Sequence, residues 1–447
     1  CGSGNFLTET YLSLRRLENK ILVKLSHGQV TMYSASESPI QVSISQFYGI
    51  EINDFAVTVA KTALWIAESQ MMKETEDVVH MPLDFLPLKS YANIVEGNAL
   101  RIDWESVVPK EKLNYIMGNP PFVGARLMNT VQKDDVLSIF DGVKNNGNLD
   151  YVSCWYKKAA DMMTSTKIRT ALVSTNSITQ GEQVAILWKN LFENGVHIDF
   201  AYRTFKWDSE ASLKAHVHCV IVGFSKAENS CEKRVFDNGS VKIAKNISGY
   251  LVEADNIVIE SRKKSICDVP KIGIGNKPID GGFYLFEEKE MLAFIEKEPQ
   301  SKLYFRKWIG SKEFINGFFR YCLWLGDCSP KELRSMPECL KRVESVKKFR
   351  LNSLSAGTRK IADKPTHFHV ENMPKSNFVL IPKVSSENRR YVPMGFLTPD
   401  ILCSDLVFII PDAELYHFGV LTSNVHMAWM RCVCGRLKSD YDYSIKV

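Results

Sequence analysis

The sequence lacks the features that mark membrane-spanning and exported proteins. No stretch of about 18 uncharged apolar residues occurs, and the N-terminus has no basic region followed by an apolar segment. The 11 cysteines are odd in number and scattered, mostly within apolar runs such as HCVIVGF around Cys219, which argues against a closed disulfide framework. These absences exclude a membrane span and predict a protein of the reducing cytoplasm.

Strong net charge, internal repeats and low-complexity tracts are missing as well. The formal net charge is +5 over 447 residues, so any attraction to a polyanion has to come from local patches. With 45% hydrophobic and 24% charged residues, the composition is typical of a soluble globular protein. The chain is long enough for two or three domains.

Helical and strand spacing alternate over roughly the first 240 residues. Helices are predicted at 5–25, 54–71, 149–163 and 182–194, with Asn53 or Asp54 as the N-cap of the second. Strands are predicted at 46–52, 93–99, 113–119, 169–177, 197–205 and 216–225, with a polar loop before 148. This order predicts a doubly wound α/β fold, with a mostly parallel sheet that ends in an antiparallel hairpin.

The pattern changes near residue 240 to irregular sequence that contains proline, glycine and short helices. Helices are predicted at 287–299 and 330–354, and 273–282 is a candidate junction or loop. The sequence therefore predicts two domains, 1–240 with the doubly wound sheet and 241–447 with a mixed α+β structure.

Three groups of residues lie at predicted turns or strand ends, on the edge of the sheet where ligands bind. Gly2 and Gly4 form a Gly-x-Gly turn that opens a helix, an arrangement that lets backbone N–H groups approach a ligand closely. Glu51 ends the next predicted strand, where a carboxylate can hold both hydroxyls of a ribose. Asn98 lies at the end of the strand predicted at 93–99, placed either to hydrogen-bond an adenine edge or only to form a strand-end turn. Together they predict a site for a nucleoside-containing cofactor.

Residues Asn119 to Phe122, NPPF, form a stiff loop at the same edge. Pro120 and Pro121 fix the backbone and push Asn119 into extended geometry. The loop offers the Asn119 side-chain oxygen and the Pro120 carbonyl as two acceptors, with Phe122 as a flat apolar face. This combination suits an exocyclic amino group on a stacked ring, although the same residues also fit a structural Pro-Pro turn with a buried phenylalanine.

An amine conjugated to a ring is a poor nucleophile, because its lone pair is delocalised. Accepting both of its hydrogens favours a pyramidal nitrogen whose lone pair points at an electrophile, so the loop would stabilise the transition state selectively. Asp150 and Tyr151, at the start of the helix predicted at 149–163, are further candidates for the base pocket. Trp155 and Tyr156 on that helix are predicted core residues.

The series CGSGNF, YGIEIN, GNAL and NPPF, in this order, resembles the motifs of class I S-adenosylmethionine-dependent amino-methyltransferases, especially DNA adenine-N6 methyltransferases. The resemblance implies a Rossmann-like methyltransferase sheet in 1–240. It implies that S-adenosylmethionine contacts Cys1, Gly2, Gly4, Asn5, Phe6, Glu51, Ile52, Asn98, Ala99 and Asn119. It also implies that Asn119, Pro120, Pro121 and Phe122 grip the target base.

Further segments, among them LDYVSCWYKKAAD, STNSITQGEQV and GRLKSDYDYS, resemble the modification half of type IIL (MmeI-like) restriction–modification proteins over nearly the whole chain. In that family a target-recognition domain follows the catalytic domain, and a nuclease is fused upstream. No acidic-x-Lys nuclease cluster is visible here. Family members usually carry Asp-Pro-Ala just before the position of Cys1, so the chain, which begins inside this motif, is predicted to be a fragment.

A basic stretch at 341–364 provides the charge that phosphate neutralisation requires, although a solvated helix face has the same composition. Arg389, Arg390, Arg431, Arg436 and Lys438 are further candidates, since arginine can address guanine with two hydrogen bonds. No metal site is predicted, because the pairs His216/His218 and His367/His369 have no further ligands at metal-site spacing. The predicted DNA-binding residues are Lys347, Lys348, Arg350, Arg359, Lys360, Arg389, Arg390, Arg436 and Lys438.

The function predicted from these features is methyl transfer from S-adenosylmethionine to adenine N6 in double-stranded DNA, in a restriction–modification system. The target base has to be flipped out of the duplex to reach the Asn119 loop. Asn-Pro-Pro-aromatic loops also occur in cytosine-N4, RNA guanine-N2 and protein-glutamine methyltransferases, so these substrates remain alternatives. A DNA-specificity fragment without activity is the alternative from another class.

Overall fold

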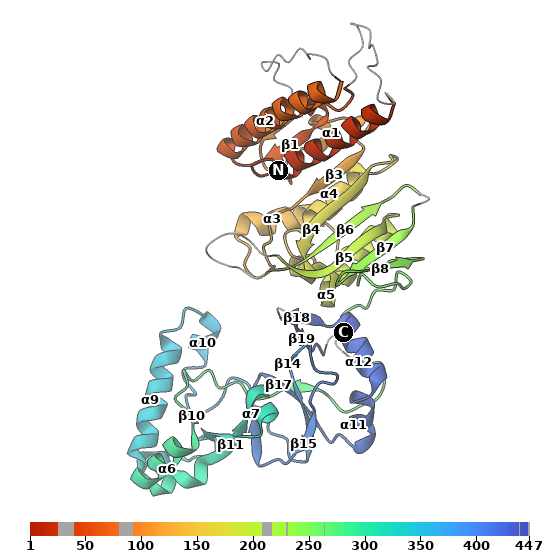
Figure 1. The fold of residues 1–447 in the computed structure, drawn as a ribbon. Helices are drawn as coiled ribbons and strands as arrows, with labels where there is room; N and C mark the ends of the chain where they lie inside the picture. Colours follow the sequence, from red (N-terminus) through yellow and green to blue (C-terminus); the bar gives the residue numbers. More distant parts are fainter. Residues whose placement is uncertain are drawn as a thin grey trace. The chain divides into compact units, whose positions relative to one another are not determined.

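The computed structural model describes residues 1–25, 40–79, 93–207, 217–228, 231–262, 264–437 and 439–445. The chain divides into two compact units, Cys1–Ile259 and Glu260–Val447 (Figure 1). The division lies later than the composition change near 240, because strands β7 (Lys233–Asp237) and β8 (Ser240–Ala244) still belong to a sheet of the first unit.

The first unit begins with two long helices side by side, α1 (Asn5–Leu25) and α2 (Asp54–Val79), next to two parallel strands, β1 (Tyr48–Glu51) and β2 (Asn93–Glu96) (Figure 1). In α2 the buried residues recur every three or four positions, as expected for one face of a helix. The Asn53 side chain accepts the backbone N–H of Ala56 at 2.9 Å, so Asn53 is the N-cap of α2.

The second sheet of this unit has six strands in the described ranges, in the order β3-β4-β6-β5-β7-β8. Strands β3, β4, β5 and β7 share one direction, and β6 and β8 run the opposite way. The predicted terminal hairpin is therefore confirmed as β5–β6, and β7–β8 adds a second one. The bounds not yet given are β3 Tyr115–Gly118, β4 Arg169–Thr175, β5 His197–Trp207 and β6 Val217–Ser225.

Helices α4 (Ser153–Met162) and α5 (Gly181–Glu193) pack on this sheet through aromatic side chains. Tyr156 of α4 stacks on Phe224 of β6 with ring centroids 5.2 Å apart and meets Trp188 of α5 edge-on at 5.7 Å. All three rings are fully buried. Their packing places the N-terminus of α4 near the end of β4, where Asp150 accepts a hydrogen bond from Thr175.

One helix lies where the sequence predicts only a polar loop. Helix α3 (Thr130–Ile139) begins with a reciprocal cap in which Asn129 and Gln132 each hydrogen-bond the other's backbone N–H. The apolar spacing of this segment is weak, so its periodicity does not indicate a helix. The capping pair is the sequence signal that could have predicted it.

The second unit contains three small sheets in the described ranges, with the orders β10-β12-β11-β16, β15-β13-β17-β9 and β14-β19-β18. The strands are short, which explains why their alternation is hard to detect in the sequence. Their bounds are β9 Gly273–Ile274, β10 Leu285–Phe286, β11 Phe305–Ile309, β12 Arg320–Leu323, β13 Phe378–Pro382, β14 Val384–Ser385, β15 Gly395–Leu397, β16 Ile401–Cys403, β17 Val407–Pro411, β18 Gly435–Leu437 and β19 Asp440–Asp442.

Helices surround these sheets and complete the mixed α+β structure. A core that includes Phe286, Trp308 and Trp324 lies between the first sheet and helices α6 and α9. The predicted helix at 330–354 is interrupted, because Pro337 begins a new helix. The helix bounds are α6 Glu288–Lys297, α7 Ser311–Asn316, α8 Pro330–Arg334, α9 Pro337–Leu351, α10 Ala356–Lys360, α11 Leu415–Leu421 and α12 Asn424–Val433.

No helix within the described residues is both long enough and apolar enough to cross a bilayer. Several cysteines lie in the two cores as thiols, among them Cys154, Cys322 and Cys403. Burial raises the pKa of Cys154 to about 12, so this thiol stays protonated and packs as a small apolar side chain.

The glycine turn before α1 generates a prediction about stability. Gly4 has a φ of +85°, and an added Cβ would lie 2.9 Å from the Cβ of Ala60. Gly2 has a φ of +59°, but an added Cβ would meet nothing within 4 Å. We expect Gly2→Ala to destabilise the first unit by about 1 kcal/mol from backbone strain alone, and Gly4→Ala by about 2–4 kcal/mol because a collision adds to that strain. Calorimetric melting of both variants tests this; equal shifts would contradict it.

Candidate active site and nucleic-acid interface

The glycine turn is held against the end of β1 by Glu51. One carboxylate oxygen, Oε2, accepts the backbone N–H of Gly2 at 2.6 Å and the amino group of Cys1 at 3.0 Å. The other, Oε1, accepts the backbone N–H groups of Ile52 and Asn53 at 3.0 and 3.2 Å. The predicted cofactor residues of the first two motifs are therefore close together.

These contacts keep Glu51 ionised. Burial of the carboxyl group opposes ionisation, but the hydrogen bonds from Cys1, Gly2 and Asn53 more than offset it and hold the pKa of Glu51 below its ordinary value. An ionised carboxylate accepts hydrogen bonds only, which is the property that binding two sugar hydroxyls requires.

The residues around this turn leave room for a ligand. A Cβ placed on Gly2 or on Gly118, at the end of β3, would meet nothing within 4 Å. Ile52 is 68% exposed and Phe55 is 74% exposed, so apolar surface lies beside the Glu51 carboxylate. Asn5 and Phe6 lie at the start of α1. Open space, a carboxylate and adjoining apolar side chains fit a nucleoside with a polar sugar and a flat ring.

The turn after β2 contains Asn98 and Ala99. The Asn98 side-chain oxygen accepts the backbone N–H of Leu100 at 2.9 Å, so Asn98 does form a strand-end turn. Its amide nitrogen lies 3.5 Å from the carboxylate of Asp135 on α3. The backbone N–H of Gly97 donates to the carbonyl of Glu51 at 2.8 Å, which joins this turn to the end of β1.

The NPPF loop leaves the carboxyl end of β3. Asn119 and Pro121 are exposed, Phe122 is half-buried and Pro120 is buried, so the asparagine faces solvent while the loop is anchored through a proline. The hydroxyl of Thr10 on α1 lies 3.2 Å from the sulfur of Met117, two residues before Asn119. This contact places β3 beside the helix that the glycine turn opens.

The residues after Phe122 are fixed to the start of α4. The backbone N–H of Tyr151 donates to the carbonyl of Val123 at 2.9 Å, and the backbone N–H of Ala125 donates to Asp150 at 3.1 Å. Asp150 also accepts a hydrogen bond from Ser177, just after β4. The loop is thus held at both of its ends by the sheet and by α4.

Asp135 and Arg101 are not among the site residues predicted from the sequence. Asp135 is 6% exposed and accepts hydrogen bonds from Arg101 Nε at 2.9 Å and from the Tyr151 hydroxyl at 2.8 Å. Burial and the hydrogen bond to Asp135 raise the pKa of Tyr151, so the tyrosine stays a hydrogen-bond donor. Asp135 lies in the unpredicted helix α3, which is why its proximity to Asn98 and Tyr151 could not be anticipated.

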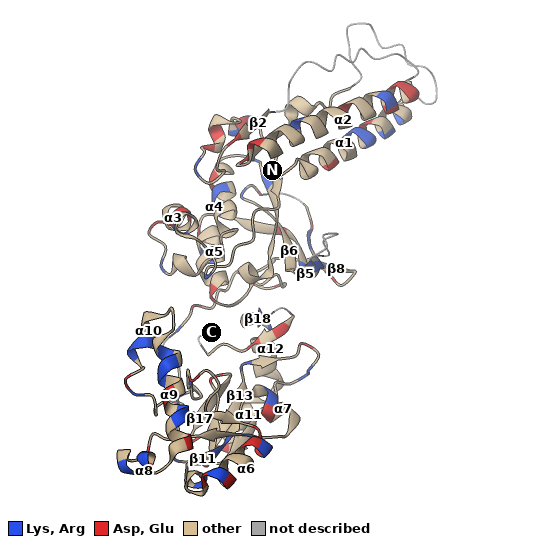
Figure 2. Ribbon diagram, turned by 90° about the vertical axis from the view of Figure 1, so that its left-hand side faces the viewer, with Lys and Arg blue, Asp and Glu red and all other residues tan. Residues whose placement is uncertain are grey.

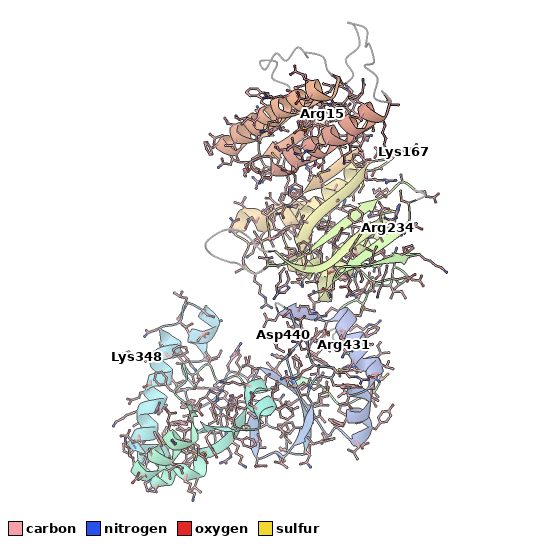
Figure 3. All side chains as sticks on the ribbon, in the orientation of Figure 1. Arg15, Lys167, Arg234, Lys348, Arg431 and Asp440 are labelled. Carbon is pink, nitrogen blue, oxygen red and sulfur yellow. The ribbon has the colours of Figure 1, made fainter. Side chains whose placement is uncertain are left out.

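In the second unit, basic residues are frequent along α9 and α10 (Figure 2). Lys347, Lys348, Arg359 and Lys360 are exposed there, and Lys348 projects from the outer side of α9 (Figure 3). Arg359 also donates to the carbonyls of Ser353 and Leu354 at 2.7 and 2.9 Å. These residues form a charged surface of the kind that phosphate groups attract.

Arg350 corrects one of the predictions from the sequence. It is fully buried, and its guanidinium donates five hydrogen bonds to backbone carbonyls within 2.7–2.9 Å. Arg350 lies on the same face of α9 as the buried residues Val343 and Val346, and not on the face of the exposed lysines. The guanidinium therefore cannot reach a phosphate. The acceptors are the carbonyls of Pro278, Ile279, Ile361, Lys364 and His367.

The remaining basic candidates lie near the C-terminal end of the chain. Arg389 and Arg390 are exposed, and Arg431 of α12 donates to the carbonyl of Arg390. The Arg436 guanidinium lies 3.7 Å from the ring centroid of Tyr441, which orients it. Lys438 lies outside the described residues.

The histidines form no metal cluster in the part of the chain that the structure describes. The imidazole Nδ1 of His367 lies 2.9 Å from a carboxylate oxygen of Glu371, a single partner. His216 lies outside the described residues.

The fold and the site define this protein as a Rossmann-like α/β methyltransferase unit followed by a mixed α+β recognition unit. The chain belongs to the MmeI family. The model of the MmeI DNA-methyltransferase domain matches residues 1–237, and the model of the MmeI target recognition domain matches residues 253–447. The resemblance of the sequence to MmeI-like proteins is thereby confirmed.

Two known proteins are similar over essentially the whole chain. DNA methyltransferase A of Bacillus subtilis (strain 168) is 45% identical over 449 residues, which cover 99% of this chain and 50% of that protein. The structure of the type IIL restriction-modification enzyme MmeI in complex with DNA matches with a TM-score of 0.93 at 42% identity. That match covers 100% of this chain and 60% of the MmeI chain, so this chain spans only part of the length of its relatives.

The position of Arg350 generates a prediction about stability. Arg350→Met removes all five hydrogen bonds, which are buried or partly buried, so we expect the second unit to lose about 3 kcal/mol or more. The matched control is Arg359→Met on exposed α10, for which we expect a change below about 1 kcal/mol. Thermal denaturation measures both, and similar losses in the two variants would contradict the structural role of Arg350.

Proposed function

We propose that this protein transfers a methyl group from S-adenosylmethionine to N6 of adenine in double-stranded DNA. The observation that carries the proposal is the Asn119–Phe122 loop at the carboxyl end of β3, with an exposed asparagine, a half-buried phenylalanine and a fixed backbone. Membership of a DNA-methyltransferase family supports the reaction class. Adenine is proposed because the loop resembles that of adenine-N6 enzymes.

Several residues of the first unit would hold the cofactor. The Gly2–Gly4 turn offers backbone N–H groups and open space for the amino-acid part, and Glu51 offers a carboxylate for the ribose hydroxyls. Ile52 and the Asn98 turn would lie against the adenine ring. The cofactor supplies an electrophilic methyl group.

The loop would hold the target amine. The Asn119 side-chain oxygen and the Pro120 carbonyl accept the two amino hydrogens, so the nitrogen lone pair becomes localised and available for attack. The half-buried Phe122 ring provides a stacking face for the flipped base. The amine loses a proton after the transfer, so no strong general base is needed.

DNA would be held by the second unit. The exposed lysines and arginines of α9 and α10 supply backbone contacts that help to offset the cost of flipping a base, a few kcal/mol. The match to a target recognition domain supports this assignment, and MmeI itself has been solved in complex with DNA. Arg389, Arg390 and Arg436 remain candidates for phosphate or base-edge contacts.

The restriction–modification context extends the proposal beyond this chain. A nuclease in the remainder of a longer protein would cleave DNA whose sites are unmethylated, and the similarity to a type IIL enzyme supports this arrangement. Incubation of the full-length protein with unmethylated DNA would reveal the cleavage products.

We also propose a cytoplasmic location for the protein, which the buried thiols support.

The alternative substrates are separated by a transfer assay. Tritiated S-adenosylmethionine is offered with DNA, RNA and protein, and labelled nucleosides are then identified. Label in N6-methyladenine of DNA is expected. Label only in RNA or protein, or in N4-methylcytosine, would replace the proposed substrate, and DNA binding without any transfer would favour a specificity fragment.

Asn119 has the most direct test. We expect Asn119→Ala to lower kcat by about 100-fold or more, because one of two acceptors for the amine is lost. DNA affinity should be nearly kept, since the loop grips only the flipped base. Asn316→Ala, an exposed helix position of the second unit, is the control that should behave as wild type. Equal loss of DNA binding and methyl transfer in Asn119→Ala would count against its catalytic role.

The basic surface of α9 has its own test. Lys347→Gln and Lys348→Gln should weaken binding to all DNA sequences alike, and each should reduce the slope of log affinity against log salt by about 1. Lys289→Gln on α6 removes the same charge from another exposed helix of this unit and should leave the slope unchanged. An unchanged slope in the α9 variants would remove these lysines from the interface.

A further inference from the structure

Asp135 lies where two parts of the candidate site meet. Helices α3 and α4 lie side by side (Figure 1). The Asp135 carboxylate of α3 accepts hydrogen bonds from Tyr151, just before α4, and from Asn98 in the turn after β2. It is 6% exposed and takes hydrogen bonds from Arg101, Tyr151 and, at 3.5 Å, Asn98. A buried carboxylate whose three donors come from two separate segments fixes those segments relative to one another.

On one side of Asp135 is the turn with Asn98 and Ala99. Asp135 holds it through the Asn98 amide and the Arg101 guanidinium. Two other groups brace the same turn: Trp104 Nε1 donates to the carbonyl of Ala99 at 2.8 Å, and Lys158 Nζ donates to the carbonyl of Ile102 at 2.7 Å. These contacts brace the turn, and among them Asp135 is the only charged acceptor.

On the other side is the loop that would hold the target amine. Tyr151 donates its hydroxyl hydrogen to Asp135 at 2.8 Å and its backbone N–H to the carbonyl of Val123 at 2.9 Å. Val123 directly follows Phe122. A movement of the Asp135 side chain is therefore passed to the loop through a single residue, Tyr151.

We propose that Asp135 is a positioning residue that couples cofactor binding at the Asn98 turn to base binding at the Asn119–Phe122 loop. The inference rests on the proposed function, since it takes the turn and the loop as the two binding sites. Cofactor bound against the braced turn restricts its motion further, the Asp135 carboxylate passes that restriction to Tyr151, and the loop is held ready for the flipped base. By linkage, base binding strengthens cofactor binding by the same factor.

A purely structural role predicts a different outcome from coupling. Loss of a buried structural contact lowers stability and weakens each ligand separately, but the factor by which one ligand strengthens the other stays the same. Loss of a coupling contact lowers that factor even when each ligand still binds alone. The ratio of two dissociation constants is therefore the readout that separates the two roles.

The test uses the full-length protein with S-adenosylhomocysteine and a duplex that carries 2-aminopurine at the methylated position. The dissociation constant of S-adenosylhomocysteine is measured with and without saturating duplex in wild type, Asp135→Asn and Tyr151→Phe. We expect the duplex to strengthen cofactor binding in wild type, and both substitutions to reduce this strengthening about fivefold or more. The 2-aminopurine fluorescence that reports the flipped base should fall in parallel.

Asp134→Asn is the matched control, because Asp134 lies one residue away on α3 and is exposed. It should keep the wild-type ratio. Tyr151→Phe keeps the ring and its packing, so it gives an answer even if Asp135→Asn folds poorly. The double variant should show no further loss, because both residues act through one hydrogen bond.

A wild-type ratio in Tyr151→Phe, or in a folded Asp135→Asn, would overturn the inference while leaving the proposed function intact. Absence of methyl transfer to DNA by the wild-type protein would instead overturn the proposed function, and the inference with it.

Discussion

The candidate site depends on Glu51, which joins three separate segments at the end of β1. Its carboxylate holds the glycine turn at Gly2, and its backbone carbonyl accepts the N–H of Gly97 beside Asn98. The constraint is electrostatic, because an ionised carboxylate has several acceptor positions and must fill them with donors when it is half-buried. One residue can therefore assemble a ligand site from segments that are far apart in the chain.

Buried carboxylates and guanidinium groups organise the rest of the protein in the same way. Asp150 fixes the segment after Phe122 to the end of β4, and Asp135 fixes the Asn98 turn to Tyr151. In the second unit, Arg350 gathers five carbonyls around its guanidinium. Such groups are costly to bury unless every donor or acceptor is satisfied, so each one specifies a single arrangement of the loops around it.

Much of the first unit was predictable because its elements are long and periodic. Helices α1 and α2, the order of strands and helices, and the β5–β6 hairpin all follow from spacing. Helix α3 was missed because its periodicity is weak, and the strands of the second unit are too short for alternation to show. The lysine-rich sequence around Arg350 predicts an exposed helix and therefore a surface position for Arg350. In the structure, Arg350 lies on the same face of α9 as the buried residues Val343 and Val346.

The class of this protein can be recognised from its sequence alone, since four motifs in order and the spacing of apolar residues are local properties that a linear chain displays. The sequence also provided the candidate residues for contact with a cofactor or a base. Which groups meet becomes visible only in the folded chain: Glu51 with Gly2, Asp135 with Asn98 and Tyr151, and Arg350 with carbonyls instead of phosphates. The physical reason is that burial and hydrogen-bond partners depend on contacts between distant segments, which no local pattern specifies.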